Sequence, residues 1–310
     1  MEKPHLGLEQ SHQLRGIAIL MILFVHSINE YPAYETSWSQ WLLIPQWGEL
    51  GCSIFFLLSG YGLTIAMQRE REQKERTRYW LTKMGKILKP YLLTYAVTFV
   101  ALTLFDGKYG ADYQFDVRTI FTLSMSDGNE MWFMKVILAN YVFLFILDTA
   151  NVKPVPRVIV FVLLHLAAAL LLRTMGLGGY WYVSNLCFPV GMALALPSIS
   201  PSRRQVLWAA CSLVVGGAAC YGVLHWRTAG EIMLNTGVAV GAFLLASYRG
   251  KTCPALRFPG KNSLLLYLFE IPVMWVIPSE GIHWSLYFAA CLICTVLCAV
   301  IYVSLCSCRE

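Results

Sequence analysis

Apolar stretches alternate with shorter polar segments along the whole chain. Ten of these stretches are each close to the length, about twenty residues, that a helix needs to cross a bilayer. They cover approximately residues 14–30, 49–67, 84–104, 130–148, 156–173, 180–197, 205–226, 231–248, 262–278 and 284–305. The pattern predicts an all-α polytopic membrane protein with about ten transmembrane helices. We expect residues 1–310 to form a single integral membrane domain.

The composition excludes a soluble enzyme or binding domain. Of the 310 residues, 57% are hydrophobic and only 14% are charged. Soluble domains are nearer to half apolar and a quarter charged, and could not bury this much apolar surface. The first apolar stretch contains Arg15 and lacks a small-residue cleavage site. We therefore expect it to remain as the first span rather than to be removed as a signal peptide.

The basic residues predict the orientation in the membrane. If the N-terminus is cytoplasmic, sixteen Lys and Arg residues lie in the inner loops or at the adjoining helix mouths, and four lie in the outer loops. Cytoplasmic loops of membrane proteins carry such an excess of positive charge. Both termini are therefore predicted to be cytoplasmic.

Cysteines give no metal-binding pattern. Among ten cysteines, mostly inside apolar stretches, only Cys291 and Cys294 show a paired spacing. In a helix inside lipid this spacing is more typical of small packing residues than of a zinc or redox site. We expect no metal, no permanently bound cofactor and no nucleic-acid partner.

The stretch LRGIAILMILFVHS places a guanidinium, Arg15, eleven residues before an imidazole, His26. In a helix, eleven steps of about 100° complete roughly three turns, so the two side chains share a face about 16 Å apart. Polar groups in an apolar helix are costly and are therefore candidates for function. The alternatives are that Arg15 reaches the interface and sets topology, and that His26 is a packing or interfacial residue.

A second basic group precedes the third stretch. Lys83, Lys86 and Lys89 come just before Pro90 and Tyr91, where we expect the span to begin. Such a cationic mouth would suit phosphate groups. Topology alone would also explain its charge.

The segment GELGCSIFFLLSGYGL, from Gly48 to Leu63, contains small residues that suggest close helix contacts: Gly51, Ser59, Gly60 and Gly62. Together with the Arg15 and His26 spacing, it resembles the membrane acyltransferase 3 family, a group of ten-span proteins that acylate envelope glycans, lipids and small molecules. The family's basic residue, ten residues, histidine motif falls on Arg15 and His26. Its GxxFFxLSG motif falls on Gly51 to Gly60, with one extra residue before the aromatic pair.

Weaker matches extend the resemblance over essentially the whole chain. The family's basic cluster before a proline and an aromatic residue is similar to Lys83, Lys86 and the following Pro90-Tyr91. Its fourth-span tryptophan motif resembles Trp132-Phe133. The segment GKNSLLLYLFEIPV resembles the family's serine, tyrosine, leucine, histidine, proline element, with Glu270 at the histidine position.

The resemblance implies transfer of an acyl group, most often acetyl, from cytoplasmic acyl-coenzyme A to a hydroxyl or, less often, an amine. The acceptor would be an envelope glycan, a lipid-linked sugar or a related molecule, and the location a lipid bilayer, the bacterial cytoplasmic membrane. Arg15, Lys83 and Lys86 would bind donor phosphates, with Ser59 and Trp132 as further donor-binding candidates.

His26 would be a general base or a nucleophile, since an imidazole titrates near neutral pH and permits either role. Glu30, on the same helix face, is a candidate to orient its ring, as are Glu49 and Glu270. For Glu30 and Glu49 a plain interfacial role is the slightly favoured alternative, because glutamates are common at membrane edges. Glu270 lies deeper in its stretch, which favours a functional or paired role.

The acceptor side and the rival functions remain open. Tyr180, Trp181 and Tyr182 could stack on a sugar, although aromatic residues are common at membrane interfaces. A transporter of a small polar solute would also use polar residues in apolar helices, but no half-repeats are evident. A scaffold without activity would tolerate replacement of Arg15 and His26. Consumption of the coenzyme A thioester separates an enzyme from a transporter.

Overall fold

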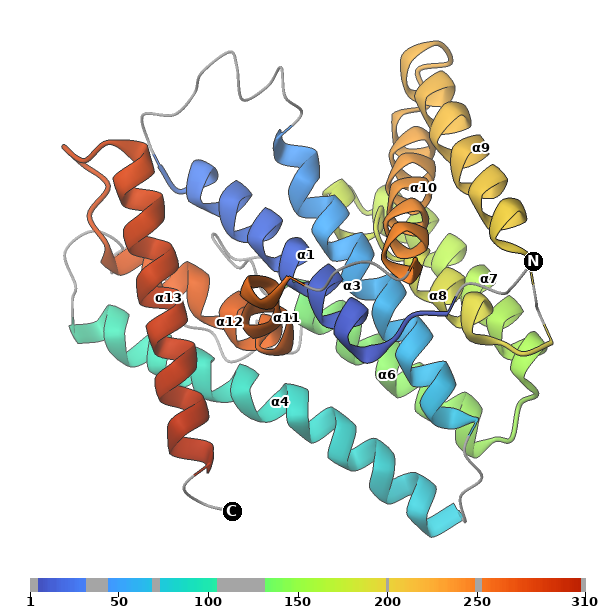
Figure 1. The fold of residues 1–310 in the computed structure, drawn as a ribbon, viewed down its shortest axis with the longest axis horizontal. Coiled ribbons are helices and arrows are strands. Elements are labelled where there is room, and N and C mark those ends of the chain that lie inside the picture. The colour runs from blue at the N-terminus through green and yellow to red at the C-terminus, as the bar shows by residue number, and fades with distance from the viewer. Residues whose placement is uncertain are drawn as a thin grey trace. The chain divides into compact units, whose positions relative to one another are not determined.

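The structure is a computed structural model that describes residues 5–31, 44–68, 73–104, 132–198, 201–248 and 253–307. Within these ranges all regular elements are helices and no strand occurs, so the all-α prediction is confirmed there (Figure 1). The chain divides into two compact units, Met1–Glu70 with Asn151–Ser263, and Arg71–Ala150 with Leu264–Glu310. The single domain over residues 1–310 stays a prediction.

The first unit contains most of the helices. In chain order they are α1 (Leu8–Asn29), α3 (Ile44–Met67), α7 (Pro154–Thr174), η1 (Gly179–Trp181), α8 (Cys187–Ala195), α9 (Arg203–Gly222), α10 (Arg227–Ser247), η2 (Pro254–Leu256) and α11 (Arg257–Lys261). The second unit contains α4 (Gln73–Leu104), α6 (Trp132–Thr149), nearly all of α12 (Ser263–Val276) and α13 (Trp284–Ser307).

Seven helices in the described ranges are long and apolar enough to cross a membrane. They are α1, α3, α6, α7, α9, α10 and α13. The predicted stretch 262–278 forms α12, which has 14 residues. The count of ten spans and the cytoplasmic placement of both termini stay predictions.

Two predicted stretches differ from single membrane-crossing helices. Residues 180–197 contain the end of η1, turns and the nine-residue α8. At 1.5 Å per residue α8 is about 14 Å long, roughly half the thickness of the hydrocarbon core. Residues 84–104 belong to a 32-residue helix that begins at Gln73. Pro90 therefore lies inside α4 rather than at a helix start, and the position at which a membrane span begins in this helix stays a prediction.

Close approach at glycine holds α1 antiparallel to α3. A Cβ on Gly51 would lie 2.7 Å from Ile22 Cγ1 and 2.8 Å from the carbonyl oxygen of Ala18. A Cβ on Gly48 would lie 3.5 Å from Val25 Cγ1. Small residues let helix backbones approach in this way, and dispersion contacts then replace contacts with lipid.

The second face of α3 packs on α8 in the same manner. A Cβ on Gly60 would meet the carbonyl group of Phe188, and a Cβ on Gly191 would meet that of Leu57. These reciprocal contacts confirm the expected role of Gly60. Gly62 is different, because it is exposed and no described atom lies within 4 Å of its Cβ position. Its predicted helix contact is absent from the described part of the chain.

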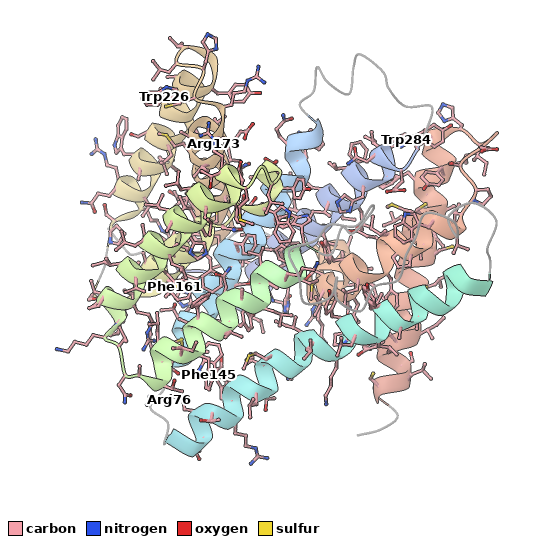
Figure 2. The ribbon with its side chains drawn as sticks, turned by 180° about the vertical axis from the view of Figure 1, so that it is seen from behind. Arg76, Phe145, Phe161, Arg173, Trp226 and Trp284 are labelled. Atoms are coloured by element: carbon pink, nitrogen blue, oxygen red, sulfur yellow. The ribbon has the colours of Figure 1, made fainter. Side chains whose placement is uncertain are left out.

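In the second unit, the first turns of α4 contact the last turn of α6. Arg76 Nη1 donates to the carbonyl oxygen of Asp148 at 3.0 Å, and the fully buried Trp80 donates from Nε1 to Asp148 Oδ2 at 2.8 Å. Phe145 packs on Trp80 with ring centroids 6.3 Å apart. Figure 2 labels Arg76 and Phe145 in this region. These contacts use the predicted basic segment, which is helical from Gln73 onward.

Candidate active site

The first span carries the two residues of the predicted motif. α1 is continuous from Leu8 to Asn29, so the eleven-residue spacing of Arg15 and His26 lies along one helix, about 16 Å apart. Both residues are half-buried. The predicted helix is confirmed, and the chemical roles of the two residues stay predictions.

The contact between α1 and α3 places His26 and Glu49 at the same depth. Gly48 faces Val25, and these two residues directly precede Glu49 and His26 in the chain. The His26 end of α1 therefore lies level with the first turns of α3, within one compact unit.

Glu49 is the centre of a polar group that we call the Glu49 cluster, with Ser53, Ser184 and Asn235 as its other members. Asn235 Nδ2 donates to Glu49 Oε2 at 3.3 Å. The hydroxyl groups of Ser53 and Ser184 both donate to the backbone carbonyl of Glu49 at 2.9 Å. The three partners of Glu49 are buried. Residues from α3, α10 and the turns before α8 thus meet around one glutamate, with Asn235 at its carboxyl group and the two serines at its backbone carbonyl.

This arrangement bears on the two interpretations of Glu49 that the sequence left open, a plain interfacial residue and a partner of His26, and the role of Glu49 stays a prediction. A plain interfacial glutamate would project into water, whereas Glu49 is hydrogen-bonded to an asparagine that is only 7% exposed. Sequence reasoning missed Asn235 and Ser184. An amide inside the apolar stretch 231–248 was the available signal for Asn235, because lone polar groups in spans need partners.

Further polar contacts link the Glu49 cluster to the start of α8. The thiol of Cys187, fully buried, lies 3.7 Å from Thr236 Oγ1 and also interacts with Ser53. Asn185 Nδ2 donates to the carbonyl oxygen of Trp181 at 2.8 Å. The turns that replace a continuous helix over 180–186 thereby place several polar side chains inside the unit.

The aromatic residues suggested for sugar stacking have different surroundings. Trp181 is fully buried and Tyr182 is 6% exposed, so both belong to the core of the first unit. Tyr180 is 36% exposed. Of the three residues, Tyr180 alone has the exposure that stacking on a sugar requires.

Ser59 lies toward the Arg15 end of α1. The Tyr61 hydroxyl accepts a hydrogen bond from the backbone N–H of Leu6 at 3.2 Å, which fixes this part of α3 beside the start of the chain's first helix. Ser59 is two residues earlier on α3 and is half-buried. Glu30 follows the last residue of α1, is half-buried, and lies near the His26 end.

The remaining predicted site residues belong to the second unit. Lys83 and Lys86 lie three residues apart on α4. Lys83 Nζ is 5.5 Å from the centroid of the Tyr79 ring, and Lys86 is exposed. Trp132, 6% exposed, begins α6, and Glu270 is fully buried in α12. The burial of Glu270 agrees with its predicted depth.

The structure thus groups the predicted residues by unit. Arg15, His26, Glu30 and Ser59 are in the first unit, and Lys83, Lys86, Trp132 and Glu270 are in the second. Within the first unit, Arg15 and His26 mark the two ends of the candidate site along α1. Across the described ranges, no three His, Cys, Asp or Glu side chains are placed to hold a metal ion.

The fold defines the class as a helical integral membrane protein, and comparison with known families defines it further. A family model described as an acyltransferase domain matches residues 9–304. The chain therefore belongs to the membrane acyltransferase 3 family and is an acyltransferase, which confirms the resemblance seen in the motifs. A search of curated proteins finds no match.

Proposed function

We propose that this protein transfers an acyl group, most often acetyl, from cytoplasmic acyl-coenzyme A to a hydroxyl group of an envelope carbohydrate or related acceptor. An amine is the less favoured acceptor, and the proposed location is the bacterial cytoplasmic membrane. The observation that carries the proposal is the position of a cation and an imidazole about three turns apart on one face of α1 in a member of an acyltransferase family.

The length of the donor supports this reading of α1. Coenzyme A carries phosphates at one end and its thioester at the end of an extended, mostly uncharged arm. The spacing of Arg15 and His26, about 16 Å, is of the same order as that arm. Arg15 would bind phosphate through charge-assisted hydrogen bonds. Lys83, Lys86, Ser59 and Trp132 are further candidates for donor binding.

His26 would act on the acceptor hydroxyl. As a general base it would accept the hydroxyl proton while the oxygen attacks the thioester carbonyl, and the carbon–sulfur bond would then break. The departing thiolate would take the proton back from the imidazolium. As a nucleophile, His26 would instead hold the acyl group transiently before the acceptor takes it.

Three carboxyl groups are candidates to support the imidazole. They are Glu30, Glu49 and Glu270, and the hydrogen bond from Asn235 and the position at the depth of His26 favour Glu49. A carboxylate that accepts from the second ring nitrogen fixes the tautomer and raises the basicity of the first. Tyr180 is the candidate for stacking on a carbohydrate acceptor.

The test is consumption of the thioester of labelled acetyl-coenzyme A by the purified protein, with envelope extract as the acceptor source. We expect wild type to release coenzyme A and to label an acceptor, and His26→Ala to do neither. If wild type leaves the thioester intact under these conditions, the proposed activity is wrong. Uptake of a polar solute into vesicles that contain the protein would then support the transporter.

A further inference from the structure

The inner half of α1 touches the segment formed by η2 and α11 through backbone atoms. A Cβ on Gly16 would lie 2.6 Å from the carbonyl oxygen of Leu256, and a Cβ on Gly260 would meet the carbonyl group of His12. Both contacts lie within the first unit. Because no side chain separates the two backbones, the residues of α11 have a fixed position beside Arg15.

Positive charge gathers where these backbones meet. Arg257 Nη2 forms an ion pair with Glu9 Oε1 at 3.3 Å. His12 interacts electrostatically with Arg15, Arg257 and Lys261, and with Glu9 as the one negative group. We call Arg15, Arg257 and Lys261 the α1–α11 cations. With one carboxylate among three cations, the group has a net positive charge.

The ion pair of Arg257 does not prevent it from binding a ligand. Its side chain is 67% exposed and that of Glu9 is 43% exposed. Exposed pairs of this kind contribute at most about 1 kcal/mol, so a phosphate with a higher charge can replace the carboxylate. The buried Nδ1 of His12 has no hydrogen-bond partner among the described residues, which leaves a polar ring atom available beside the cations.

We infer that the α1–α11 cations bind the phosphate groups of the acyl-coenzyme A donor, with Arg257 and Lys261 completing the site that Arg15 begins. This inference rests on the proposed function. Guanidinium groups match phosphate oxygens in paired, charge-assisted hydrogen bonds, and an ammonium group adds a point charge. Phosphates held here would lie at the opposite end of α1 from His26, where the thioester is needed.

Topology explains positive charge at an inner loop but not the convergence of three cations on one histidine. Arg204, in the first turn of α9, is an exposed basic residue of the same unit whose charge topology also explains. Arg204 provides a matched control, because it lies on α9 and is not one of the cations that interact with His12. An anionic lipid headgroup offers the same phosphate chemistry as the donor, so the experiment must separate these two sources.

The experiment measures binding of coenzyme A, 3′-dephospho-coenzyme A and pantetheine by calorimetry, with the full chain in zwitterionic nanodiscs. We expect Arg257→Gln and Lys261→Gln each to weaken coenzyme A binding about fivefold, and the double variant by more than tenfold. Arg204→Gln should stay within about twofold of wild type. Pantetheine affinity should be the same in all variants. Glu9→Gln should tighten coenzyme A binding about twofold, because it removes a competing carboxylate.

Three results would overturn the inference, and they differ from one another. If wild type binds coenzyme A and the double variant binds it equally well, the inference fails while the proposed function stands. If wild type neither binds coenzyme A nor consumes its thioester, the proposed function fails first. If coenzyme A binding is unchanged and the double variant loses retention of labelled phosphatidylglycerol, the cations hold a lipid headgroup. Thermal unfolding of each variant confirms that these exposed substitutions leave the fold intact.

Discussion

The two ends of α1 use polar residues in opposite ways. At the Arg15 end, charged side chains are partly exposed, and one ion pair joins Glu9 to Arg257 across α1 and α11. At the His26 end, the carboxyl group of Glu49 accepts a hydrogen bond from the buried amide of Asn235. The backbone carbonyl of Glu49 accepts hydrogen bonds from two buried hydroxyl groups. One helix thus joins an exposed, cationic end to a buried, hydrogen-bonded end.

The difference indicates what each end can contribute to acyl transfer. Exposed cations are solvated and mobile, so they can attract a phosphate but hold it only moderately. Buried polar groups have few alternative partners, and their hydrogen bonds fix geometry at a higher cost if one is removed. We therefore expect substitutions at the Arg15 end to change donor affinity and substitutions at the His26 end to change the rate of transfer.

The largest effect is expected from His26→Ala. Loss of a general base typically lowers the rate by about 10²–10⁴, so we expect acyl transfer to fall by about that factor, with coenzyme A affinity unchanged. His5, exposed near the start of the described chain, provides His5→Ala as a control with wild-type activity. Equal activity in wild type and His26→Ala would remove His26 from the chemistry.

Two glycines provide the next prediction, because their surroundings differ. In Gly260→Ala the new Cβ would meet the backbone carbonyl of His12, which cannot move aside as a side chain would. We therefore expect the free energy of unfolding to fall by about 1–3 kcal/mol. Gly62→Ala adds a methyl group to an exposed helical position with space around it among the described residues. It should be neutral or slightly stabilising. Thermal unfolding in nanodiscs measures both, and equal shifts would contradict the packing of α1 on α11.

A stability effect of similar size is expected from Asn235→Ala. The substitution removes the amide that donates to Glu49 and leaves a buried acceptor without it, at a cost of about 1–3 kcal/mol in stability. If Glu49 supports His26, the transfer rate should fall about tenfold while coenzyme A affinity stays the same. Steady-state kinetics and calorimetry on the same preparation separate the two quantities. A change in coenzyme A affinity with an unaltered transfer rate would contradict this prediction, because Asn235 would then act on donor binding and not on His26.

The smallest effect on stability is expected from Glu9→Gln. The ion pair with Arg257 is exposed on both sides, so its loss should change the free energy of unfolding by less than about 0.5 kcal/mol. The same thermal unfolding measurement, repeated at low and high salt, tests this value. A loss above about 1 kcal/mol would show that the pair is structural, and a phosphate could not then replace Glu9 easily.

Much of the fold followed from local pattern. The stretches 14–30, 156–173 and 284–305 correspond to α1, α7 and α13, because a helix satisfies its own backbone hydrogen bonds and needs only an apolar surface of sufficient length. The same rule failed over 180–197. Hydropathy records that a segment is apolar, but it cannot distinguish a full span from turns and a short helix buried inside a unit.

The candidate site followed only in part. Arg15 and His26 were accessible to sequence reasoning because their relation is a spacing within one helix. Glu49 was visible as a residue, but its hydrogen bond to Asn235 joins positions 186 residues apart. Arg257 and Lys261 are among the basic residues that topology alone explains at the level of sequence, because their position beside Arg15 depends on contacts at Gly16 and Gly260.

The sequence by itself determined the class of the protein, the helical spacing of Arg15 and His26, and the family to which the chain belongs. These properties depend on composition and on short-range periodicity, which can be counted along the chain. Tertiary structure alone decided which polar groups surround each end of α1. Such contacts depend on how closely backbones approach, and that distance is set by several small residues from distant segments acting together.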